Sequence, residues 1–470
     1  MSEELILKID KLIEENVQNL VDDTIRLINI KSVKGEPLPG APFGEGPKKV
    51  FEEVEKMSDE AGFYFKDYNV GVISLALKDK EPDLGIWLHG DVVPEGTGWN
   101  FEPYNGKEYN GYIIGRGASD NKGQLSAIYN LFKIFKQLNV PLNYNPAIYV
   151  GSNEETGKAD LKGLTGNNDA KGFLNVCKTP KLSLVPDGSF PVGYGGKGGA
   201  VITLQSKKPL SNFTLTAGLD ATPGEAVAVF DKGVEFPTLS ECTITKGEET
   251  KVSTFSPPRH GASPDPNGNM ITKISKALID TDVISADDKR TLEFLKLVSL
   301  DVKGEFLGIK TSHEQLGELT VFSKKAESVD GFVQLMINVR FPLGITADEI
   351  LENVAKKGSE YGFEIFTKAI GDGAYMVNPD SEVAKELTKI SNEVTKDNDK
   401  PYTMAGGTYA HVLPNAYVFG TDANIAPADF PEDRGSVHSV DESASIERLK
   451  RAMRIYARAL IKLNDIDWFN

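Results

Sequence analysis

The sequence contains only two cysteines among its 470 residues, Cys177 and Cys242. They lie far apart and form no CxxC motif, so neither a disulfide framework nor a cysteine-based zinc site is expected. We interpret both as ordinary reduced side chains. Cysteine chemistry is therefore not part of the function that we predict.

Long apolar runs are also absent. No stretch of about 18 apolar residues occurs, which is the length that a membrane-spanning helix needs. Residues 1–20 alternate charged and apolar side chains without an uninterrupted apolar core or a cleavage site. This pattern is typical of an amphipathic helix rather than a signal peptide. We therefore expect a cytoplasmic protein that does not bind membranes.

Basic residues are in deficit. Lysine and arginine together number 52 against 68 aspartates and glutamates, which gives a formal net charge of −16 at pH 7. Nucleic acids and anionic membranes would be repelled by such a chain rather than attracted to it. The charge excludes both as partners and favours small molecules or peptides.

What the chain does contain is the composition of a folded protein. Its hydrophobic fraction is 40% and its charged fraction is 26%, close to the averages of globular proteins. Its length exceeds what one hydrophobic core usually supports. We therefore expect two or more domains.

The first part of the chain alternates helical and strand patterns. Helices are predicted at about 45–62 and 121–138, and strands at about 70–77, 84–89, 146–151 and 181–186. Such alternation predicts an α/β sheet flanked by helices. The pattern returns after residue 372 and ends in an amphipathic helix near 441–463.

The middle of the chain has a different character. Residues 193–371 are rich in strand patterns such as AVITLQS and QLMINVRFP, placed around helical stretches near 268–280 and 285–300. A glycine-dense segment, GYGGKGGA, opens this region and gives the chain freedom to turn into a new domain. We predict one α/β domain, residues 1–192 and 372–470, interrupted by an inserted α+β domain, residues 193–371.

Polar residues directly after predicted strands are the first candidates for chemistry, because ligands bind at the carboxyl ends of strands in open α/β sheets. The strand that includes IWL ends in His89-Gly90-Asp91. The imidazole can face a metal while the carboxylate of Asp91 fixes the histidine tautomer from behind. Taken alone, this short pattern is more typical of an ordinary structural histidine.

Two further aspartates occupy comparable positions. Asp120 lies in GRGASDNKG between a strand pattern and the helix that begins near Gly123, and Asp187 follows the strand KLSLVP. Asp120 is predicted either to bridge cations or to cap the helix. Asp187 is predicted either to bind a cation or to shape the turn beside Gly188.

Two adjacent glutamates and a late histidine complete the set. Glu154 and Glu155 follow the strand AIYVG, where neighbouring carboxylates repel unless a cation or a shared proton relieves them. His438 lies in HSVDE after a long loop that contains proline. On exposed loops, these residues would simply be solvated.

Together these five places offer two histidines and several carboxylates, which suits a pair of divalent cations. Mixed imidazole and carboxylate ligands favour zinc, manganese or cobalt over calcium. Two such cations can share a water, lower its pKa and polarise a carbonyl. One glutamate of the adjacent pair can then bind metal while the other moves protons.

Several segments resemble, in order, the motifs of a known family. They are LHGDVVPEG at 88–96, GRGASDNKG at 115–123, NEETG at 153–157, PDGSFP at 186–191, MINVRFP at 336–342 and HSVDE at 438–442. The chain resembles the co-catalytic zinc metallopeptidases, the family of aminoacylases and glutamate carboxypeptidases, and among them the bacterial dipeptidases of the PepV type. The resemblance spans nearly the whole chain. It implies a catalytic metal-binding domain interrupted by a lid domain.

The resemblance also implies a role for each metal-site residue. Asp120 bridges both metals, His89 and Asp187 bind one, and Glu155 and His438 bind the other. Glu154 becomes the general base, and Asp91 keeps the supporting role that its spacing suggests. The implied cofactors are two divalent metal ions, zinc in the first place, with manganese or cobalt as alternatives.

In the predicted inserted domain and beyond, the resemblance implies residues that contact substrate. His260, in RHGASPDPNGN, would stabilise the tetrahedral oxyanion, and Arg340 would hold a substrate carboxylate. The loop AGGTYAHVLPN would offer the backbone amides of Gly406, Gly407 and Thr408.

Two positions depart from the family pattern. His411 stands where relatives commonly carry arginine, and Asp220, in GLDATPGEA, replaces an asparagine of the lid. Both are candidate substrate-binding residues, and their change puts the substrate range in doubt.

The leading hypothesis is a metal-dependent dipeptidase that cleaves short peptides with a free C-terminus by a metal-bridging hydroxide. The alternatives are an N-acyl amino acid amidohydrolase, such as an aminoacylase or desuccinylase, and a catalytically silent protein that keeps the fold. A large lid can supply the substrate-contacting histidine within one chain. We therefore expect a monomer, with a homodimer as the alternative.

Overall fold

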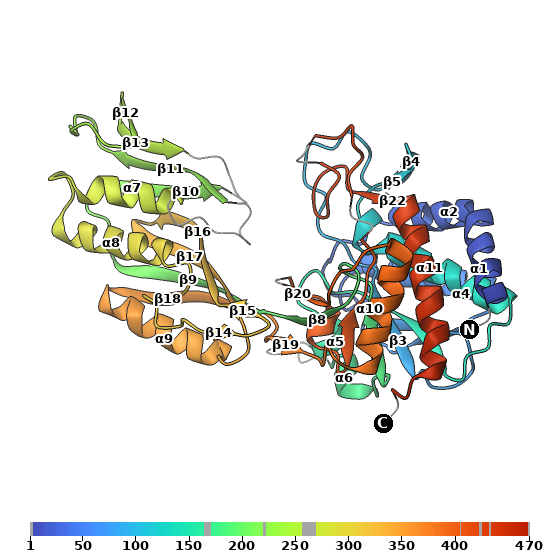
Figure 1. Ribbon diagram of the computed structural model, residues 1–470. Helices are drawn as coiled ribbons and strands as arrows, with labels where there is room; N and C mark the ends of the chain where they lie inside the picture. Colours follow the sequence, from blue (N-terminus) through green and yellow to red (C-terminus); the bar gives the residue numbers. More distant parts are fainter. Residues whose placement is uncertain are drawn as a thin grey trace. The chain divides into compact units, whose positions relative to one another are not determined.

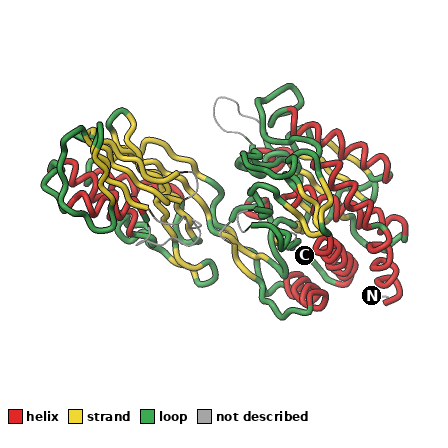
Figure 2. Tube along the Cα trace, turned by 90° about the horizontal axis from the view of Figure 1, so that it is seen from above, coloured by secondary structure: helices red, strands yellow, loops and turns green. Residues whose placement is uncertain are grey.

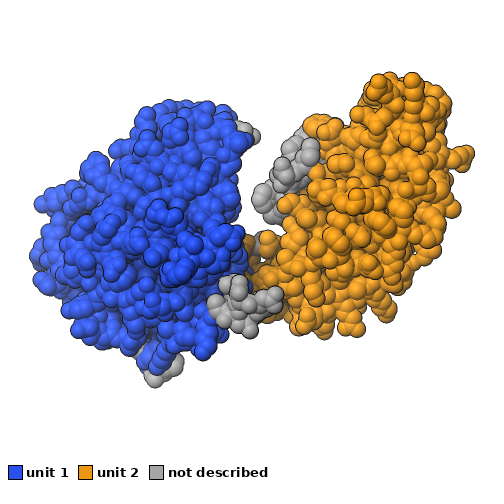
Figure 3. All heavy atoms as spheres, turned by 180° about the vertical axis from the view of Figure 1, so that it is seen from behind, with its two compact units in different colours: residues 1–195, 376–403, 408–470 blue, residues 196–375, 404–407 orange. Residues whose placement is uncertain are grey.

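A computed structural model describes residues 3–163, 171–219, 222–255, 269–404, 406–422, 425–431 and 434–468 (Figure 1). The chain divides into two compact units (Figure 3). Unit 1 comprises residues 1–195, 376–403 and 408–470, and unit 2 comprises residues 196–375 and 404–407. Among the described residues, no helix is long and apolar enough to cross a membrane.

The helices of unit 1 come from both ends of the chain. They are α1 (Glu3–Glu15), α2 (Val17–Ile28), α3 (Glu45–Ala61), α4 (Gly123–Gln137), α5 (Ala159–Lys162), α6 (Phe173–Val176), α10 (Glu382–Thr395) and α11 (Ile446–Lys462), with the helical turns η1 (Ala118–Lys122), η2 (Tyr409–His411) and η3 (Leu463–Asp465). In α11, Leu449, Met453, Tyr456 and Leu460 recur at helical spacing and are buried. This apolar stripe packs the last helix against α1, α4 and α10.

The main sheet of unit 1 gives the site its platform. Its strand order is β1 (Tyr64–Asp67), β2 (Val72–Ala76), β6 (Pro146–Gly151), β3 (Leu84–His89), β7 (Leu182–Val185), β21 (Ala416–Val418), β8 (Gly193–Gly196) and β19 (Tyr375–Met376), with β20 (Tyr402–Met404) beside β8. Strands β6, β3, β7 and β21 are mutually parallel. The first three are buried along their whole length, as their continuous apolar sequences predict.

The register of the parallel strands brings distant residues to one edge. His89 ends β3 opposite Gly151, the last residue of β6. Ile86 of β3 pairs with Leu184, one residue before the end of β7. The segments that follow these three strands therefore leave the sheet at the same edge, where the predicted metal ligands lie. A smaller sheet of β22 (Ser443–Ser445), β5 (Tyr112–Ile114) and β4 (Lys107–Tyr109) joins the end of the chain to the region before Asp120.

Unit 2 is an antiparallel sheet covered by helices (Figure 2). Its strand order is β12 (Thr243–Lys246), β13 (Thr250–Phe255), β11 (Thr222–Phe230), β10 (Phe213–Leu219), β16 (Thr320–Val329), β17 (Phe332–Phe341), β9 (Gly198–Pro209) and β18 (Phe363–Ile370). Its helices are α7 (Met270–Ile279), α8 (Ala286–Leu300) and α9 (Ala347–Glu360), and a short hairpin joins β14 (Ser312–His313) to β15 (Gly317–Glu318). Burial alternates along β17, as in a sheet with one covered face.

Side-chain caps set several helix starts in unit 2. The hydroxyl of Ser285 accepts a hydrogen bond from the backbone N–H of Asp288, 3.1 Å away. Thr346 and Glu349 form a reciprocal capping box at the start of α9. The predicted helices at 268–280 and 285–300 are confirmed as α7 and α8. The expected α/β character with an α+β insertion is likewise confirmed.

Candidate metal centre

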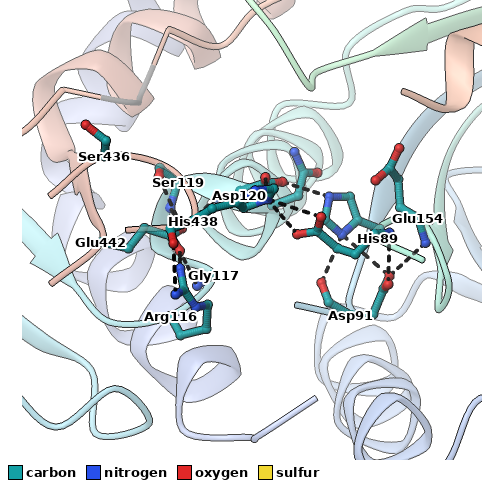
Figure 4. A network of polar contacts seen from close by, with 12 residues as sticks. His89, Asp91, Arg116, Gly117, Ser119, Asp120, Glu154, Ser436, His438 and Glu442 are labelled. Carbon is teal, nitrogen blue, oxygen red and sulfur yellow. Dashed lines mark hydrogen bonds and ion pairs between the residues drawn. The ribbon is translucent and has the colours of Figure 1, made fainter. Parts of the chain in front are cut away.

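The predicted ligands gather where strands of unit 1 end. His89 is the last residue of β3, Asp187 lies two residues beyond β7, and Glu155 follows β6 in a tight turn. Asp120 comes from η1, and His438 comes from the loop before β22. Figure 4 shows His89, Asp120 and His438 in one network of polar contacts. Residues that are hundreds of positions apart in sequence thus share one site.

Asp120 stands between the two histidines. Its Oδ1 lies 2.9 Å from Nε2 of His89, and its Oδ2 lies 3.1 Å from Nε2 of His438. Each carboxylate oxygen therefore faces a different imidazole. With this arrangement, Asp120 would offer one oxygen to a cation beside each histidine.

The donor atoms form two groups that share Asp120. One group is His89, Asp120 and Asp187, and the other is Asp120, Glu155 and His438. Within each group the ligand atoms lie within 4.8 Å of one another. Imidazole nitrogens and carboxylate oxygens without sulfur fit zinc, manganese or cobalt. These residues fit a pair of divalent cations, and Glu154 belongs to neither group.

The electrostatics show how strongly the carboxylates dominate this site. Hydrogen bonds to Asp120 and Glu155 raise the pKa of His438 to about 10, against a smaller effect of burial. Burial acts to lower the pKa of His89, but contacts with Asp120 and Asp91 raise it well above its ordinary value. Burial would raise the pKa of Asp120, yet hydrogen bonds from both histidines hold it below its ordinary value. The site attracts positive charge.

The pKa values of two other carboxylates, Asp187 and Glu154, are raised in this site. Burial raises the pKa of Asp187 to about 7, and the negative charges of Asp120 and Glu155 add to the effect. Burial also raises the pKa of Glu154 to about 8. A cation that binds beside such a carboxyl group stabilises its ionised form and so lowers its pKa.

Asp91 supports the site in two ways. Its backbone carbonyl lies 2.9 Å from Nδ1 of His89, so that nitrogen donates and Nε2 is left to face Asp120. Its carboxylate lies 3.5 Å from Nδ1 and accepts the backbone N–H groups of Glu154 and Glu155 at 3.1 and 3.2 Å. The sequence suggests only the contact with His89. The structure adds that Asp91 fixes the turn that carries both glutamates.

Glu442 is a supporting residue whose role no pattern in the sequence indicates. Its buried carboxylate accepts hydrogen bonds from the backbone N–H groups of Gly117, Ser119 and Asp120 and from the Ser119 hydroxyl, at 3.0 to 3.2 Å. The guanidinium of Arg116 lies 2.6 Å from the same carboxylate. Glu442 therefore ties the segment that carries His438 to the segment that carries Asp120 (Figure 4).

Asp160 fixes the turn after β6 from the other side. Its carboxylate accepts the backbone N–H groups of Ser152 and Asn153, at 2.9 and 3.1 Å, and a hydrogen bond from the hydroxyl of Tyr409. Burial raises the pKa of Asp160 to about 6. No motif marks Asp160 or Tyr409 in the sequence, because their link is made only in the fold. Glu442, by contrast, lies within the motif HSVDE. Its contacts with Arg116 and with the backbone before Asp120 exist only in the fold, so the sequence alone does not reveal them.

The predicted substrate-binding residues lie in several places. Gly406 and Gly407 are exposed, and Thr408 is the N-cap of η2, where its hydroxyl accepts the backbone N–H of Ala410. The backbone N–H of Thr408 donates to Nδ1 of His411 at 3.2 Å, so the imidazole helps to close this turn. The structure therefore gives His411 a local contact beside its predicted role.

Arg340 lies near the end of β17 in unit 2 and is exposed. It pairs across the strands with Gly199, where a Cβ would come within 2.6 Å of the guanidinium. The missing side chain of Gly199 leaves room for Arg340 to lie over β9. His260 and Asp220 fall outside the described residues, so their assignments stay predictions.

Comparison with known proteins places this geometry in a family. Residues 86–462 match Peptidase family M20/M25/M40. YtjP of Bacillus subtilis strain 168, named as a candidate dipeptidase, is 26% identical over 471 positions that cover 95% of this chain and 97% of YtjP.

Solved structures share the fold. Human carnosine dipeptidase 1 has a TM-score of 0.59 at 14% identity and covers 98% of this chain and 100% of its own. YxeP of Bacillus subtilis, described as a dinuclear metal-binding peptidase of the M20 family, has a TM-score of 0.51 at 9% identity, with 96% and 99% covered. The match over most of the chain, together with the two ligand groups, shows that this chain belongs to Peptidase family M20/M25/M40 and is a metallopeptidase.

Proposed function

We propose that this metallopeptidase is a dipeptidase that uses two divalent cations to hydrolyse short peptides with a free C-terminus. The observation that carries the proposal is the position of Asp120, whose two oxygens face His89 and His438 separately. A carboxylate placed in this way would be shared between two cations, one on the side of each histidine. We further propose zinc as the resident metal, with manganese or cobalt as alternatives, and a monomeric protein in the cytoplasm.

The chain's own residues hold the cations. His89 and Asp187 are assigned to one, Glu155 and His438 to the other, and Asp120 to both. When bound, the two cations supply Lewis acidity at the attacked carbonyl and lower the pKa of a water beside it. Asp91 and Glu442 keep the ligand-bearing segments in place through the hydrogen bonds described above.

Glu154 is assigned to move the proton. It lies next to a proposed ligand in sequence, yet it belongs to neither ligand group, so its carboxylate is not assigned to a metal. Asp91 anchors its backbone at 3.1 Å. Burial raises the pKa of Glu154 in the metal-free site, and two cations beside it would lower that pKa toward the range in which a carboxylate takes a proton from water and returns it to the leaving amine.

The substrate class rests on two supports. YtjP and carnosine dipeptidase 1 are both named as dipeptidases, the first as a candidate. Arg340 is proposed to bind the C-terminal carboxylate of the peptide, because a guanidinium pairs with a carboxylate through two parallel hydrogen bonds. Gly406, Gly407 and Thr408 are proposed to add backbone N–H donors to the same carboxylate. The proposed roles of His260, His411 and Asp220 in substrate contact are unchanged.

A substrate panel tests the proposal. The protein is stripped with a chelator and reloaded with zinc, manganese or cobalt. Each form is then assayed on unblocked dipeptides, on the same dipeptides as C-terminal amides, and on N-acetyl and N-succinyl amino acids. We expect activity to vanish on chelation, to return with metal, and to be greatest on unblocked dipeptides. A clear preference for the acylated amino acids would overturn the dipeptidase assignment in favour of an amidohydrolase.

The amide substrates also test Arg340. Replacing it with alanine should lower kcat/KM on free dipeptides about 10- to 100-fold, since a hydrogen bond to a charged group contributes about 1.5–3 kcal/mol. The same variant should leave the weak activity on dipeptide amides unchanged. An equal loss on both substrates would contradict the carboxylate contact.

A further inference from the structure

Lys158 is a buried lysine in direct contact with the proposed proton carrier. Its Nζ lies 3.2 Å from Oε1 of Glu154, and the two side chains are only 8% and 7% exposed. Burying two charges is favourable only when they compensate each other closely. The contact is therefore a specific feature of the site rather than a surface ion pair.

The backbone of the turn forces this contact. The N–H of Lys158 donates to the carbonyl of Asn153 at 2.7 Å, and the side-chain oxygen of Asn153 accepts the N–H of Ala159 at 3.0 Å. The carbonyl of Lys158 accepts the N–H groups of Leu161 and Lys162 in α5, at 3.1 and 2.9 Å. With φ at 60°, Lys158 takes a left-handed conformation that few residues other than glycine adopt. These bonds close the turn and bring the lysine side chain back over Glu154.

The charges around Glu154 indicate what Lys158 does in this site. Glu154 lies near two other carboxylates, those of Asp187 and Glu155, whose negative charges repel its own. Without Lys158, the carboxylate of Glu154 would be repelled by its neighbours and would lack a fixed partner.

We propose that Lys158 is a positioning residue for Glu154. Its ammonium forms an ion pair with Oε1 at 3.2 Å, which leaves the other carboxylate oxygen to exchange protons with water and with the leaving amine. Lys158 belongs to neither ligand group, so its effect should fall on the proton-transfer step and not on metal binding. This inference rests on the role of Glu154 in the proposed function.

Steady-state kinetics with the metal-loaded protein give the first test. The variants are Lys158→Met, which keeps the length without the charge, Lys158→Arg, which keeps the charge, and Lys162→Met, an exposed control four residues on. We expect Lys158→Met to lower kcat about 10- to 100-fold, less than the 10²–10⁴-fold that a general base itself contributes, at unchanged KM and metal content. Lys158→Arg should recover most of kcat, and Lys162→Met should match the wild type.

The metal-free protein gives a second test that does not depend on activity. Lys158→Met should lower the melting temperature, because it removes the side chain that Glu154 contacts inside the buried turn. Adding Glu154→Gln should cause little further loss, since the contact between the two side chains is already gone. If the double variant lost as much melting temperature as the two single variants together, the pairing would be overturned. A wild-type kcat in Lys158→Met would overturn it as well. A wild-type protein without dipeptidase activity would instead overturn the proposed function and leave the thermal test of the pairing in force.

Discussion

Glu154 and Glu155 are adjacent in sequence but are assigned opposite tasks, and their separate replacement tests this. Glu154→Gln should lower kcat about 10²- to 10⁴-fold while both metals stay bound, because only the proton carrier is lost. Glu155→Gln should instead lower the bound metal from two ions to one, because Glu155 is a member of the His438 group. Activity assays and elemental analysis of the dialysed proteins measure both effects.

The assignment of different roles to Glu154 and Glu155 is tested by comparing the two variants. Both replacements are neutral and equal in size, so each serves as the matched control for the other. Loss of metal in Glu154→Gln, or full metal content in Glu155→Gln, would contradict the assignment.

Gly151 tests how tightly the turn after β6 is built. A Cβ at this position would overlap the hydroxyl of Tyr409 and the carboxylate of Asp160. Gly151→Ala should therefore lower the free energy of unfolding by about 1–3 kcal/mol, as overpacking does, and should reduce activity because the turn carries Glu154 and Glu155. Gly373→Ala is the control, since a Cβ there meets nothing within 4 Å. Equal denaturation midpoints for the two variants would show that the turn can shift freely.

Single residues were predictable from the sequence where a strand pattern pointed to them. His89, Glu155 and Asp187 follow apolar strands, and parallel strands bring their carboxyl ends to one edge. Lys158 and Asp160 follow no such strand. Their contacts depend on a left-handed turn and on the hydroxyl of Tyr409, which arrives from far along the chain. A sequence pattern does not encode a contact of that kind.

At the scale of elements, Glu442 joins two segments that hold the bridging aspartate and one of the histidines. Glu442→Gln keeps the shape of the side chain but leaves the buried guanidinium of Arg116 without its compensating charge. We expect a loss of about 3–5 kcal/mol in unfolding free energy. We also expect metal affinity to fall about 10- to 100-fold, because the amides of Ser119 and Asp120 lose a charged acceptor.

An exposed glutamate on the following helix gives the comparison. Glu447 is 69% exposed and pairs with Lys450 at the surface. Surface pairs of this kind contribute about 0–1 kcal/mol, so Glu447→Gln should change neither unfolding nor metal competition measurably. If Glu442→Gln behaved like Glu447→Gln in both measurements, Glu442 would not be a support of the site.

Whole elements were predicted more reliably than their ends. Strands β3 and β6 coincide with the predicted ranges 84–89 and 146–151, because continuous apolar runs define buried parallel strands. The final helix begins at Ile446 rather than near residue 441, since residues 443–445 form β22 beside β5. The hairpin of β4 and β5 is short and partly exposed, so its sequence shows no alternation of apolar and polar residues long enough to predict it.

At the scale of the molecule, each unit has its own hydrophobic core, and the metal site belongs to unit 1 alone. The core of unit 1 includes Leu88 and the core of unit 2 includes Leu335, both fully buried. Because the cores are separate, we expect calorimetry to show two unfolding transitions. A cation that binds only the folded site stabilises it by about 4 kcal/mol at a free concentration 1,000 times its Kd. Chelation should therefore lower the transition of unit 1 and leave that of unit 2 in place.

Core substitutions assign the two transitions. Leu88→Ala should lower one of them and Leu335→Ala the other, each by about 2–5 kcal/mol, because each leaves a cavity in a different core. The transition that responds to Leu88→Ala should be the one that zinc raises, and Glu155→Gln should reduce that rise. If zinc raised both transitions by the same amount in the wild type, the two units would unfold together and the site would stabilise the whole chain.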